Sequence, residues 1–388
     1  MKATKSLRCA WLFPSLVKGS YWHPIFALFT DKFNQTVIYT GVWPGYLKGF
    51  ENTFKINIVG KTKTIKGKLI RTDDGQYFAY SSFILASPSI IFKLTSYRPR
   101  IIFTSGFSIW TIIAIILKII FHWKVIILYD GSSPSIDYVD SKYRLLIRKV
   151  IAKGSDSLVA NSLGARNYMT EILQIKPDKI YYFHYLVPDS KILTRNSKQN
   201  SPKKDIDKIR FVFVGEVIQR KGLRVLIDCL GEIYRQGQHN FSLDVIGDGS
   251  ARESLQALAK ETGITNLICW HGWIKYEKLC HYIAATDVLV FPTFEDIWGM
   301  VVLEAMILGK PVLCSKWAGS SELITEGVNG YVFDPNQKDS LTKYLCQFIN
   351  NPSLIEELGY EASQTALSYS PEKAVKEFEK LVHCLLKA

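Results

Sequence analysis

The most apolar helix-like stretch of the chain carries a carboxylate in its middle. Residues 300–308 read Met-Val-Val-Leu-Glu-Ala-Met-Ile-Leu, so apolar residues flank Glu304 on nearly every side. A helix that is apolar all round is buried, and a buried carboxylate needs a hydrogen-bonding partner because its desolvation is expensive. A sugar diol is one possible partner, and a neighbouring arginine or backbone amide is the alternative. We favour a binding role for Glu304.

Glycines bracket this predicted helix. Gly299 precedes its first turn and Gly309 follows its last, as is typical of helix ends. The first N–H groups of a helix have no partner inside it, and they attract anions. We therefore expect the start of this helix to suit a phosphate group.

Two adjacent cations follow the predicted strand 209–214. The strand ends at Gly215, and Arg220-Lys221-Gly222 precedes the next helical segment. Cations at the carboxyl end of a strand could hold a diphosphate. The alternative is a pair of solvated loop cations, which is the better interpretation of this motif taken alone.

A partial dinucleotide-binding fingerprint lies further along. Gly247-Asp248-Gly249 follows a predicted strand, but Arg252 replaces the third glycine of GxGxxG. An isolated GxG is weak evidence for a dinucleotide site. We interpret it as a tight strand-to-helix turn.

Short apolar strands alternate with helix-length segments through the second half of the chain. This alternation predicts a parallel, doubly wound α/β sheet, and uninterrupted apolar strands are expected when both sheet faces are covered. The predicted strands are 209–214, 243–246, 267–270, 288–291, 311–314 and 331–333. The first half repeats the pattern with candidate strands 7–13, 36–39, 101–104, 125–128 and 157–160.

A polar, lysine-rich stretch separates the two halves and predicts a linker. We therefore predict an N-terminal domain over 1–190, a linker over 191–208 and a C-terminal domain over 209–365. A C-terminal helix within 366–388 is expected to pack back toward the first domain. Ligands of doubly wound sheets bind at the carboxyl ends of the strands, so we expect the site in a cleft between the two domains.

The excess positive charge lies entirely in the first half. Residues 1–190 contain 25 Lys+Arg and 11 Asp+Glu, whereas residues 191–388 contain 23 and 24. A basic half attracts nucleic acid, an anionic membrane or a phosphorylated ligand, and charge alone does not choose among them.

Part of this charge lies in a segment of short alternating runs between residues 50 and 80. It carries Lys61, Lys63, Lys66, Lys68 and Arg71. The pattern predicts a basic hairpin inserted in the first domain. Lysines that protect a solvated sheet edge are the alternative.

Cysteine usage predicts a cytoplasmic protein without a disulfide frame or a metal site. The seven cysteines are scattered, and no CxxC occurs. We expect no secretory signal, because Lys2, Lys5 and Arg8 are followed by only a short apolar run. The longest uncharged stretch, 101–117, is shorter than the ~20 apolar residues that a spanning helix needs, so we expect no membrane crossing.

Several motifs together resemble one enzyme family. FVGEVIQRKG, VIGDG, ATDVLVFPTFEDIWGMVVLEAMILGKPVLCS, GSSELI and VNGYVFD occur in order over residues 213–334. In this order and spacing they resemble the donor domain of retaining glycosyltransferases of family 4. The resemblance implies the GT-B fold, an α/β architecture of two Rossmann-like doubly wound domains that face a cleft. The first half is similar only in outline.

The resemblance also implies an activity and a set of site residues. It implies that a sugar is transferred from a nucleotide-sugar with retained anomeric configuration and without a metal or other cofactor. Asp296 and Glu304 match the family's two carboxylates, the first near the donor sugar and the second on the ribose hydroxyls. Lys221 matches the diphosphate-binding lysine. The backbone N–H groups of Gly299, Met300, Val301 and Val302 are expected to meet the diphosphate or the sugar, beside Gly215.

The chain departs from the family pattern at several positions. The first carboxylate is usually glutamate, so either Asp296 or the preceding Glu295 could act. Glu216 replaces a diphosphate-binding arginine, and we expect Arg220 to supply the missing charge. In the first domain, Asp130 stands where the family often has a histidine. It could orient the acceptor hydroxyl or cap the following turn.

Gly19, in the loop after the first predicted strand, is expected to let the backbone approach the donor phosphate.

These observations favour a retaining glycosyltransferase that uses a UDP- or GDP-sugar. The expected acceptor is a membrane lipid or a lipid-linked or other saccharide, in the synthesis of a surface polysaccharide or glycolipid. We expect a cytoplasmic protein with peripheral contact to the anionic inner face of the cell membrane, and no nucleic-acid partner. The alternatives are an NAD-linked Rossmann oxidoreductase, a nucleic-acid-binding module and an inactive glycosyltransferase-like scaffold.

Overall fold

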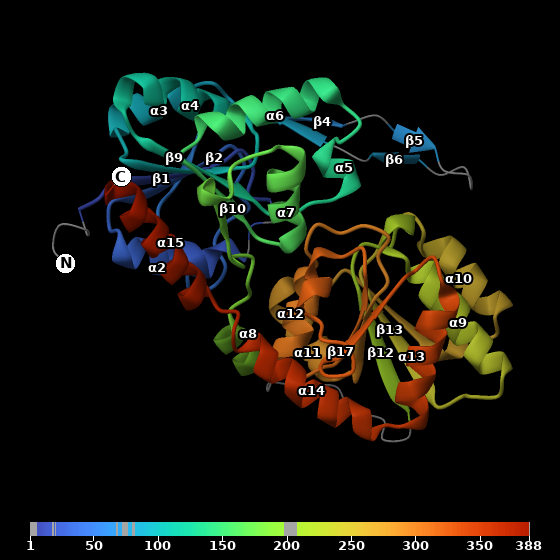
Figure 1. Ribbon diagram of the computed structural model, residues 1–388. Helices are drawn as coiled ribbons and strands as arrows, with labels where there is room; N and C mark the ends of the chain where they lie inside the picture. The colour runs from blue at the N-terminus through green and yellow to red at the C-terminus, as the bar shows by residue number, and fades with distance from the viewer. Residues whose placement is uncertain are drawn as a thin grey trace. The chain divides into compact units, whose positions relative to one another are not determined.

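The computed structural model describes residues 6–17, 19, 21–66, 69–71, 77–79, 82–197 and 208–387. The chain forms two units (Figure 1). Unit 1 comprises Met1–Val187 and Pro371–Ala388, and unit 2 comprises Pro188–Ser370. Each unit contains its own parallel sheet.

Unit 1 is built on a seven-stranded sheet in which all neighbouring strands are parallel, in the order β11-β10-β9-β8-β1-β2-β3. The chain runs from β1 outward to β3 and then returns to β8 on the other side of β1. The sheet is therefore doubly wound, with its switch point between β1 and β8. The strands are β1 (Cys9–Phe13), β2 (Thr36–Thr40), β3 (Ile56–Ile58), β8 (Ile101–Ser105), β9 (Lys124–Tyr129), β10 (Ser157–Ala160) and β11 (Ile180–Tyr182).

Helices cover both faces of this sheet (Figure 1). Helices α3, α4 and α6 lie on one face, and α2 and α15 lie on the other. The helices of unit 1 are α2 (Trp22–Lys32), α3 (Ile90–Tyr97), α4 (Ile109–Phe121), α5 (Pro134–Asp137), α6 (Lys142–Gly154), α7 (Leu163–Asn167) and α15 (Pro371–Lys387). The short turns η1 (Tyr168–Ile172) and η2 (Pro177–Lys179) follow α7.

Antiparallel strands are present where the sequence predicts a basic hairpin. Strand β4 (Lys63–Lys66) pairs with β7 (Ser82–Leu85), and β5 (Leu69–Arg71) pairs with β6 (Tyr77–Ala79). Lys68 lies outside the described residues.

Unit 2 is built on a six-stranded parallel sheet in the order β14-β13-β12-β15-β16-β17. It is also doubly wound, since the chain leaves β12 toward β14 and then crosses to β15 on the other side. The strands are β12 (Ile209–Val214), β13 (Phe241–Ile246), β14 (Ile268–Gly272), β15 (Val288–Phe291), β16 (Val312–Ser315) and β17 (Gly330–Phe333). Both halves of the chain thus have the Rossmann-like α/β architecture that the sequence predicts.

The helices of unit 2 include one that is nearly all buried. In α12 every residue from Val301 to Met306 is buried, as its apolar sequence predicts. The helices are α8 (Ser190–Ser197), α9 (Leu223–Arg235), α10 (Arg252–Glu261), α11 (Tyr276–Ala284), α12 (Met300–Ile307), α13 (Lys338–Asn350) and α14 (Ser353–Ala366). The turns η3 (Gln219–Lys221), η4 (Thr265–Leu267) and η5 (Gly319–Leu323) connect them to strands.

The structure differs from the sequence-based boundaries at both ends of unit 2. Helix α8 (Ser190–Ser197) occupies residues 191–197 of the predicted linker and packs on α11 and α12. The linker prediction rested on polar composition, whereas the packing of this short helix buries Leu193. Unit 2 also extends to Ser370, five residues beyond the predicted end of the second domain at 365.

Helix α15 belongs to unit 1 although it follows unit 2 in the chain. It packs on α2 (Figure 1). Its Phe378 is fully buried, with ring centroids 5.3 Å from Trp11 and 5.5 Å from Phe103. An aromatic cluster of this kind anchors the end of the chain on the first sheet.

Candidate functional site

The predicted site residues of unit 2 follow two neighbouring strands. Strand β12 pairs directly with β15, which pairs with β16. The carboxyl ends of parallel strands lie at the same edge of a sheet, so the loops after these strands meet there. We call the predicted site residues of these loops and of α12 the unit 2 site: Gly215, Arg220, Lys221, Glu295, Asp296, Gly299, Met300, Val301, Val302 and Glu304.

An ion pair joins the two loops. The Lys221 ammonium contacts Asp296 Oδ2, and both side chains are largely shielded from solvent, with exposed fractions of 15% and 14%. The same ammonium lies 5.6 Å from the centre of the Phe291 ring. An ion pair in such surroundings is screened less than one at an open surface.

Arg220 is bound to the other loop through its backbone and its side chain. Its guanidinium Nη1 donates to the carbonyl oxygen of Glu295 at 2.5 Å. Its own carbonyl oxygen accepts the N–H of Phe294 at 2.8 Å. The loop that carries Arg220 and Lys221 is therefore hydrogen-bonded to the loop that carries Glu295 and Asp296.

This close approach requires a glycine at 222. Gly222 has a φ of +72°, and a Cβ there would lie 1.9 Å from the carbonyl oxygen of Pro292. Any larger residue would push the two loops apart. The sequence showed this glycine but not its contact, because the partner is 70 residues away.

Backbone hydrogen bonds join the loop after β12, which begins at Gly215, to the segment after β13 that contains Gly247-Asp248-Gly249. The N–H of Gly215 donates to the carbonyl oxygen of Ile246 at 3.0 Å, and the N–H of Val217 donates to that of Asp248 at 2.9 Å. The Gly247-Asp248-Gly249 segment is thus held as a turn against the strand-end loop.

Backbone hydrogen bonds hold Asp296 in place. Its N–H donates to the carbonyl oxygen of Trp317 at 3.2 Å, and its carbonyl oxygen accepts the N–H of Gly319 at 3.0 Å. Its Oδ1 accepts the N–H of Trp298 at 3.2 Å. The carboxylate therefore has one oxygen on the backbone that leads into α12 and the other on Lys221.

Helix α12 begins at a crowded glycine. Gly299 has a φ of +94°, and a Cβ there would lie 2.6 Å from the Phe291 ring and 2.9 Å from Ser320 Oγ. Met300 and Val301 occupy the first turn, where N–H groups have no helical partner. The N–H of Val302, by contrast, donates to the carbonyl oxygen of Gly299 at 3.0 Å.

Glu304 is buried in α12 and hydrogen-bonded to a tyrosine. Its side chain is 3% exposed, and Oε1 accepts the Tyr276 hydroxyl at 2.8 Å. Burial raises the pKa of Glu304 from its ordinary 4.5 to about 7, and the Tyr276 hydrogen bond partly offsets this rise. Sequence reasoning missed Tyr276, because the first residue of an amphipathic helix carries no signal of what it faces.

Unit 1 contains two predicted site residues, Gly19 and Asp130, which we call the unit 1 site. Asp130 directly follows β9, and its Oδ1 accepts the Tyr185 hydroxyl at 2.9 Å. Burial raises the pKa of Asp130 to about 6, and the Tyr185 bond lowers it in part. Asp130 also acts on the loop after β1: burial raises the pKa of Tyr21, two residues beyond Gly19, and the negative charge of Asp130 raises it further.

The segment that carries Asp130 is anchored by groups that the sequence did not single out. The Tyr129 hydroxyl donates to Asp137 Oδ1 at 2.5 Å, and the Ser132 hydroxyl contacts Oδ2 of the same carboxylate. Arg148 donates to the Asp137 carbonyl oxygen at 3.2 Å. These bonds tie the two sides of the segment together and so limit the positions that Asp130 can take.

Gly19 lies in a tight turn after β1. Its N–H donates to the carbonyl oxygen of Leu16 at 2.9 Å, and its own carbonyl oxygen accepts the N–H of Trp22 at 3.0 Å. A Cβ at this position would lie 2.9 Å from Leu16 atoms. The turn brings the chain directly into α2.

Within the described residues, one group of side chains has the donor types of a metal site: Asp244, Cys269 and His271. It shares no residue with the unit 1 site or the unit 2 site.

The second half of the chain is similar in sequence to known proteins. Residues 194–365 match the family of glycosyl transferases group 1. An uncharacterised glycosyltransferase of Methanocaldococcus jannaschii is 26% identical over 170 residues, 44% of this chain and 46% of that protein. The D-inositol 3-phosphate glycosyltransferase of Streptomyces griseus is 30% identical over 129 residues, 33% of this chain and 27% of that protein. These matches thus span less than half the length of either relative.

A solved structure is similar along nearly the whole chain. HepE of Anabaena, crystallised with UDP, superimposes with a TM-score of 0.75 over 97% of this chain and 100% of its own, at 15% identity. This likeness shows the fold: the chain is GT-B, with two Rossmann-like α/β units.

Among the helices of the described residues, none has both the length and the apolarity that a bilayer crossing requires.

The buried carboxyl of Glu304 makes stability depend on pH in a defined direction. Between pH 4.5 and about 7 the unfolded chain ionises this group while the folded chain keeps it protonated, so ionisation favours unfolding. The free energy of unfolding of the wild type should therefore fall relative to Glu304→Gln as the pH rises through this range. The pKa rise corresponds to at most on the order of 3 kcal/mol.

Urea unfolding at several pH values would measure this difference. Glu357→Gln, on the exposed side of α14, is the matched control and should follow the wild-type profile. A wild type that keeps a constant difference from Glu304→Gln across this range would contradict the assigned pKa.

Proposed function

We propose that the protein is a retaining glycosyltransferase, from the premise that residues 194–365 match the family of glycosyl transferases group 1. It moves a sugar from a UDP- or GDP-sugar to a hydroxyl acceptor. The observation that carries the proposal is the Lys221–Asp296 ion pair beside the start of α12. It brings a cation, a carboxylate and a helix N-terminus to one edge of a Rossmann-like sheet.

The unit 2 site contains groups that can stabilise the negative charge of the leaving diphosphate in such a reaction. When the bond from the sugar C1 to the phosphate oxygen breaks, negative charge grows on the diphosphate while the sugar becomes oxocarbenium-like. Lys221, Arg220 and the first N–H groups of α12 are positioned to stabilise that charge without a metal. We assign the amides of Met300 and Val301 to this role, because that of Val302 is already bonded inside the helix turn.

The two carboxyls of the unit 2 site take different roles. We assign Glu304 to the ribose hydroxyls, whose donors can replace or join the Tyr276 hydroxyl on the carboxylate. We assign Asp296 rather than Glu295 to the donor sugar, because its side chain is part of the ion pair with Lys221. The new bond forms between the acceptor oxygen and C1, and the acceptor proton passes to an oxygen of the leaving diphosphate.

Asp130 of the unit 1 site is assigned to the acceptor hydroxyl. With a pKa of about 6, it is mainly ionised at pH 7 and can accept a hydrogen bond. Tyr185 and the anchored segment around Asp137 hold its position. Gly19, in the turn after β1, is assigned to a close approach of the backbone to the donor phosphate.

A thermal-shift and hydrolysis screen against UDP-, GDP- and ADP-sugars tests the proposal. One nucleotide at 100 times its Kd should stabilise the wild type by about 2.7 kcal/mol, with UDP tested first because HepE was crystallised with it. Glu304→Ala should abolish the shift, whereas the exposed control Glu357→Ala should retain it. No shift with any nucleotide-sugar would overturn the proposed function.

Arg220 should matter for nucleotide binding where Glu216 does not. The guanidinium of Arg220 is held by its hydrogen bond to the Glu295 carbonyl oxygen, whereas Glu216 is exposed. Because a charge-assisted hydrogen bond contributes about 1.5–3 kcal/mol, Arg220→Ala should weaken binding of the nucleoside diphosphate by roughly 10-fold or more. Calorimetry would measure this loss, and Glu216→Ala should change the affinity little. Equal effects of the two substitutions would refute the assignment.

We further propose that unit 1 docks on an anionic membrane, where a lipid-linked acceptor would lie. Helix α4 exposes Ile116, Ile119 and Ile120, which are 57%, 76% and 68% exposed. The neighbouring α6 exposes Leu146 and Val150, which are 60% and 64% exposed. We call these five residues the α4–α6 face; the two helices touch, since Lys118 of α4 donates to the Gly154 carbonyl at the end of α6.

The cations of α6 complement the negative charge of an anionic membrane, so we propose that a membrane binds the α4–α6 face. The sequence of α6 contains five cations and no carboxylate. Arg148 bonds to the Asp137 carbonyl and the Tyr168 hydroxyl within unit 1, and the other four cations are Lys142, Arg144, Lys149 and Lys153. Apolar side chains beside cations are the combination that anionic lipid surfaces attract.

Vesicle sedimentation tests this docking. The wild type should bind phosphatidylglycerol vesicles, more weakly at high salt, and should bind phosphatidylcholine vesicles less. A combined Ile119→Asp and Ile120→Asp variant should lose on the order of 10-fold or more in binding. Leu367→Asp, at another exposed position, is the control. Binding that ignores lipid charge and both isoleucines would refute the docking.

A further inference from the structure

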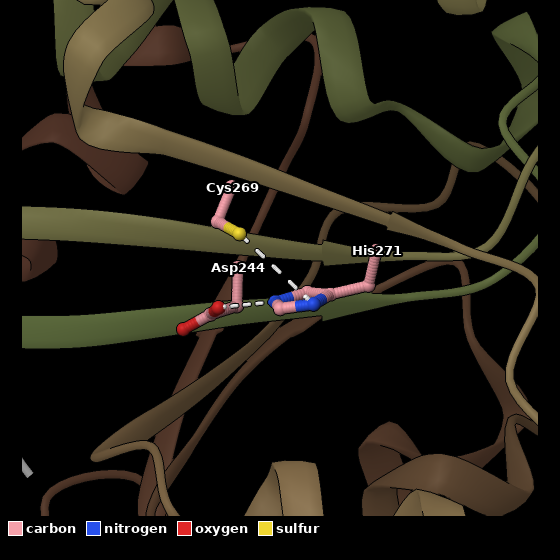
Figure 2. A group of neighbouring side chains, drawn as sticks. All are labelled: Asp244, Cys269 and His271. Atoms are coloured by element: carbon pink, nitrogen blue, oxygen red, sulfur yellow. Dashed lines mark hydrogen bonds and ion pairs between the residues drawn. The ribbon is translucent and has the colours of Figure 1, made fainter. Parts of the chain in front are cut away.

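A cysteine, a histidine and an aspartate meet on the outer strands of the unit 2 sheet (Figure 2). Asp244 lies on β13, and Cys269 and His271 lie on β14, the edge strand. Asp244 pairs directly with Cys269 in the strand register, so their side chains lie on the same face.

A β-bulge places His271 over the carboxylate. The register shifts between Val245, which pairs with Trp270, and Ile246, which pairs with Gly272, so His271 is the extra residue. Bulges re-aim a side chain and often occur at functional positions. Here the imidazole contacts both the carboxylate and the thiol (Figure 2).

The carboxylate determines which imidazole nitrogen faces the thiol. Asp244 is 4% exposed, and its Oδ1 lies 2.5 Å from His271 Nε2. Its Oδ2 accepts Arg210 Nη2 at 2.9 Å. Arg210 and His271 each contact one oxygen of this carboxylate, and a carboxylate oxygen at hydrogen-bond distance accepts, so we place the imidazole proton on Nε2. The lone pair of Nδ1 then points toward Cys269, whose Sγ is 4.0 Å away.

We propose that Cys269 Sγ and His271 Nδ1 bind a thiophilic divalent metal of the zinc class, with Asp244 behind the histidine. In a tetrahedral zinc site, ligand bonds of about 2.3 Å to sulfur and 2.0–2.1 Å to nitrogen place the two ligand atoms about 3.6 Å apart. A shift of a few tenths of an ångström therefore converts the observed contact into a metal site. A carboxylate on the far nitrogen of a ligand histidine is the usual support for such a metal.

The surroundings allow an ion and its waters to enter. A cavity of about 190 Å³ is lined by Arg210, Asp244, Cys269, His271 and Tyr282. Cys269 is exposed, so an ion can reach its thiol, and a metal that binds the sulfur displaces the thiol proton. Arg210 contacts the oxygen that does not touch His271, so its charge weakens the attraction for the cation without occupying the ligand position.

The metal would join residues of the edge strand β14 and, through Asp244, connect them to β13. It would therefore stabilise the folded unit, since any ligand that binds only the folded state does so. This role uses no residue of the unit 2 site and does not depend on the proposed transferase activity.

Cadmium titration of the full-length chain tests the site. One equivalent of Cd²⁺, added after chelator treatment and without thiol reductants, should produce the ultraviolet band of a cadmium–thiolate bond. Cys269→Ser should abolish this band, and His271→Ala should weaken binding at least 10-fold. Cys384→Ser, which removes the other exposed cysteine, should retain it. A wild type without the band, or a Cys269→Ser variant with an unchanged band, would overturn the proposal.

Zinc and the thermal midpoint provide an independent readout. Zn²⁺ should raise the midpoint of the wild type and of Cys384→Ser but not that of Cys269→Ser. Asp244→Asn should weaken metal binding by about 10- to 100-fold while keeping the thiolate band, because the residue supports a ligand and is not one. An equal midpoint shift with and without Cys269 would refute the site, whatever the outcome of the nucleotide-sugar screen.

Discussion

Parallel pairing of β12 with β15 is the constraint on which the unit 2 site depends. Phe211 pairs with Val288 and Val212 with Leu289, so loops that are far apart in sequence leave the sheet side by side. Lys221 can then contact Asp296, 75 residues further along. Gly222 permits the approach because no side chain separates it from the Pro292 carbonyl. The chemistry of the site follows from strand order more than from any single residue.

Burial acts in the same way on two carboxyl groups in different units. Glu304 and Asp130 both have raised pKa values because they are removed from water, and each accepts a hydrogen bond from a tyrosine hydroxyl. A neutral donor partly compensates the desolvation without cancelling the carboxyl's capacity to accept further bonds. Such groups are suited to meet ligand hydroxyls, which is the role proposed for both.

The structure shows where the charged residues behind the uneven net charge of the two halves lie. The second half is nearly neutral, yet Lys221 and Arg220 lie together on the loop after β12, which is hydrogen-bonded to the loop after β15. The basic first half carries cations along α6, beside apolar side chains that α4 leaves exposed. Net charge is a property of the sequence, whereas the combination of charge with exposed apolar surface is a property of the fold.

The sequence by itself determined the fold class, the strands and the residue types that could do chemistry. Apolar strands alternating with helices predict parallel sheets because both sheet faces must be covered, and an apolar helix with one glutamate predicts a buried carboxylate. It did not show that Ser190–Ser197 form a helix, because their composition is polar and the burial of Leu193 depends on tertiary packing. Only tertiary structure chose Tyr276 as the partner of Glu304, joined Lys221 to Asp296 and re-aimed His271 toward Asp244. Each of these contacts joins residues far apart in the chain, so it depends on strand order and register, which local patterns do not encode.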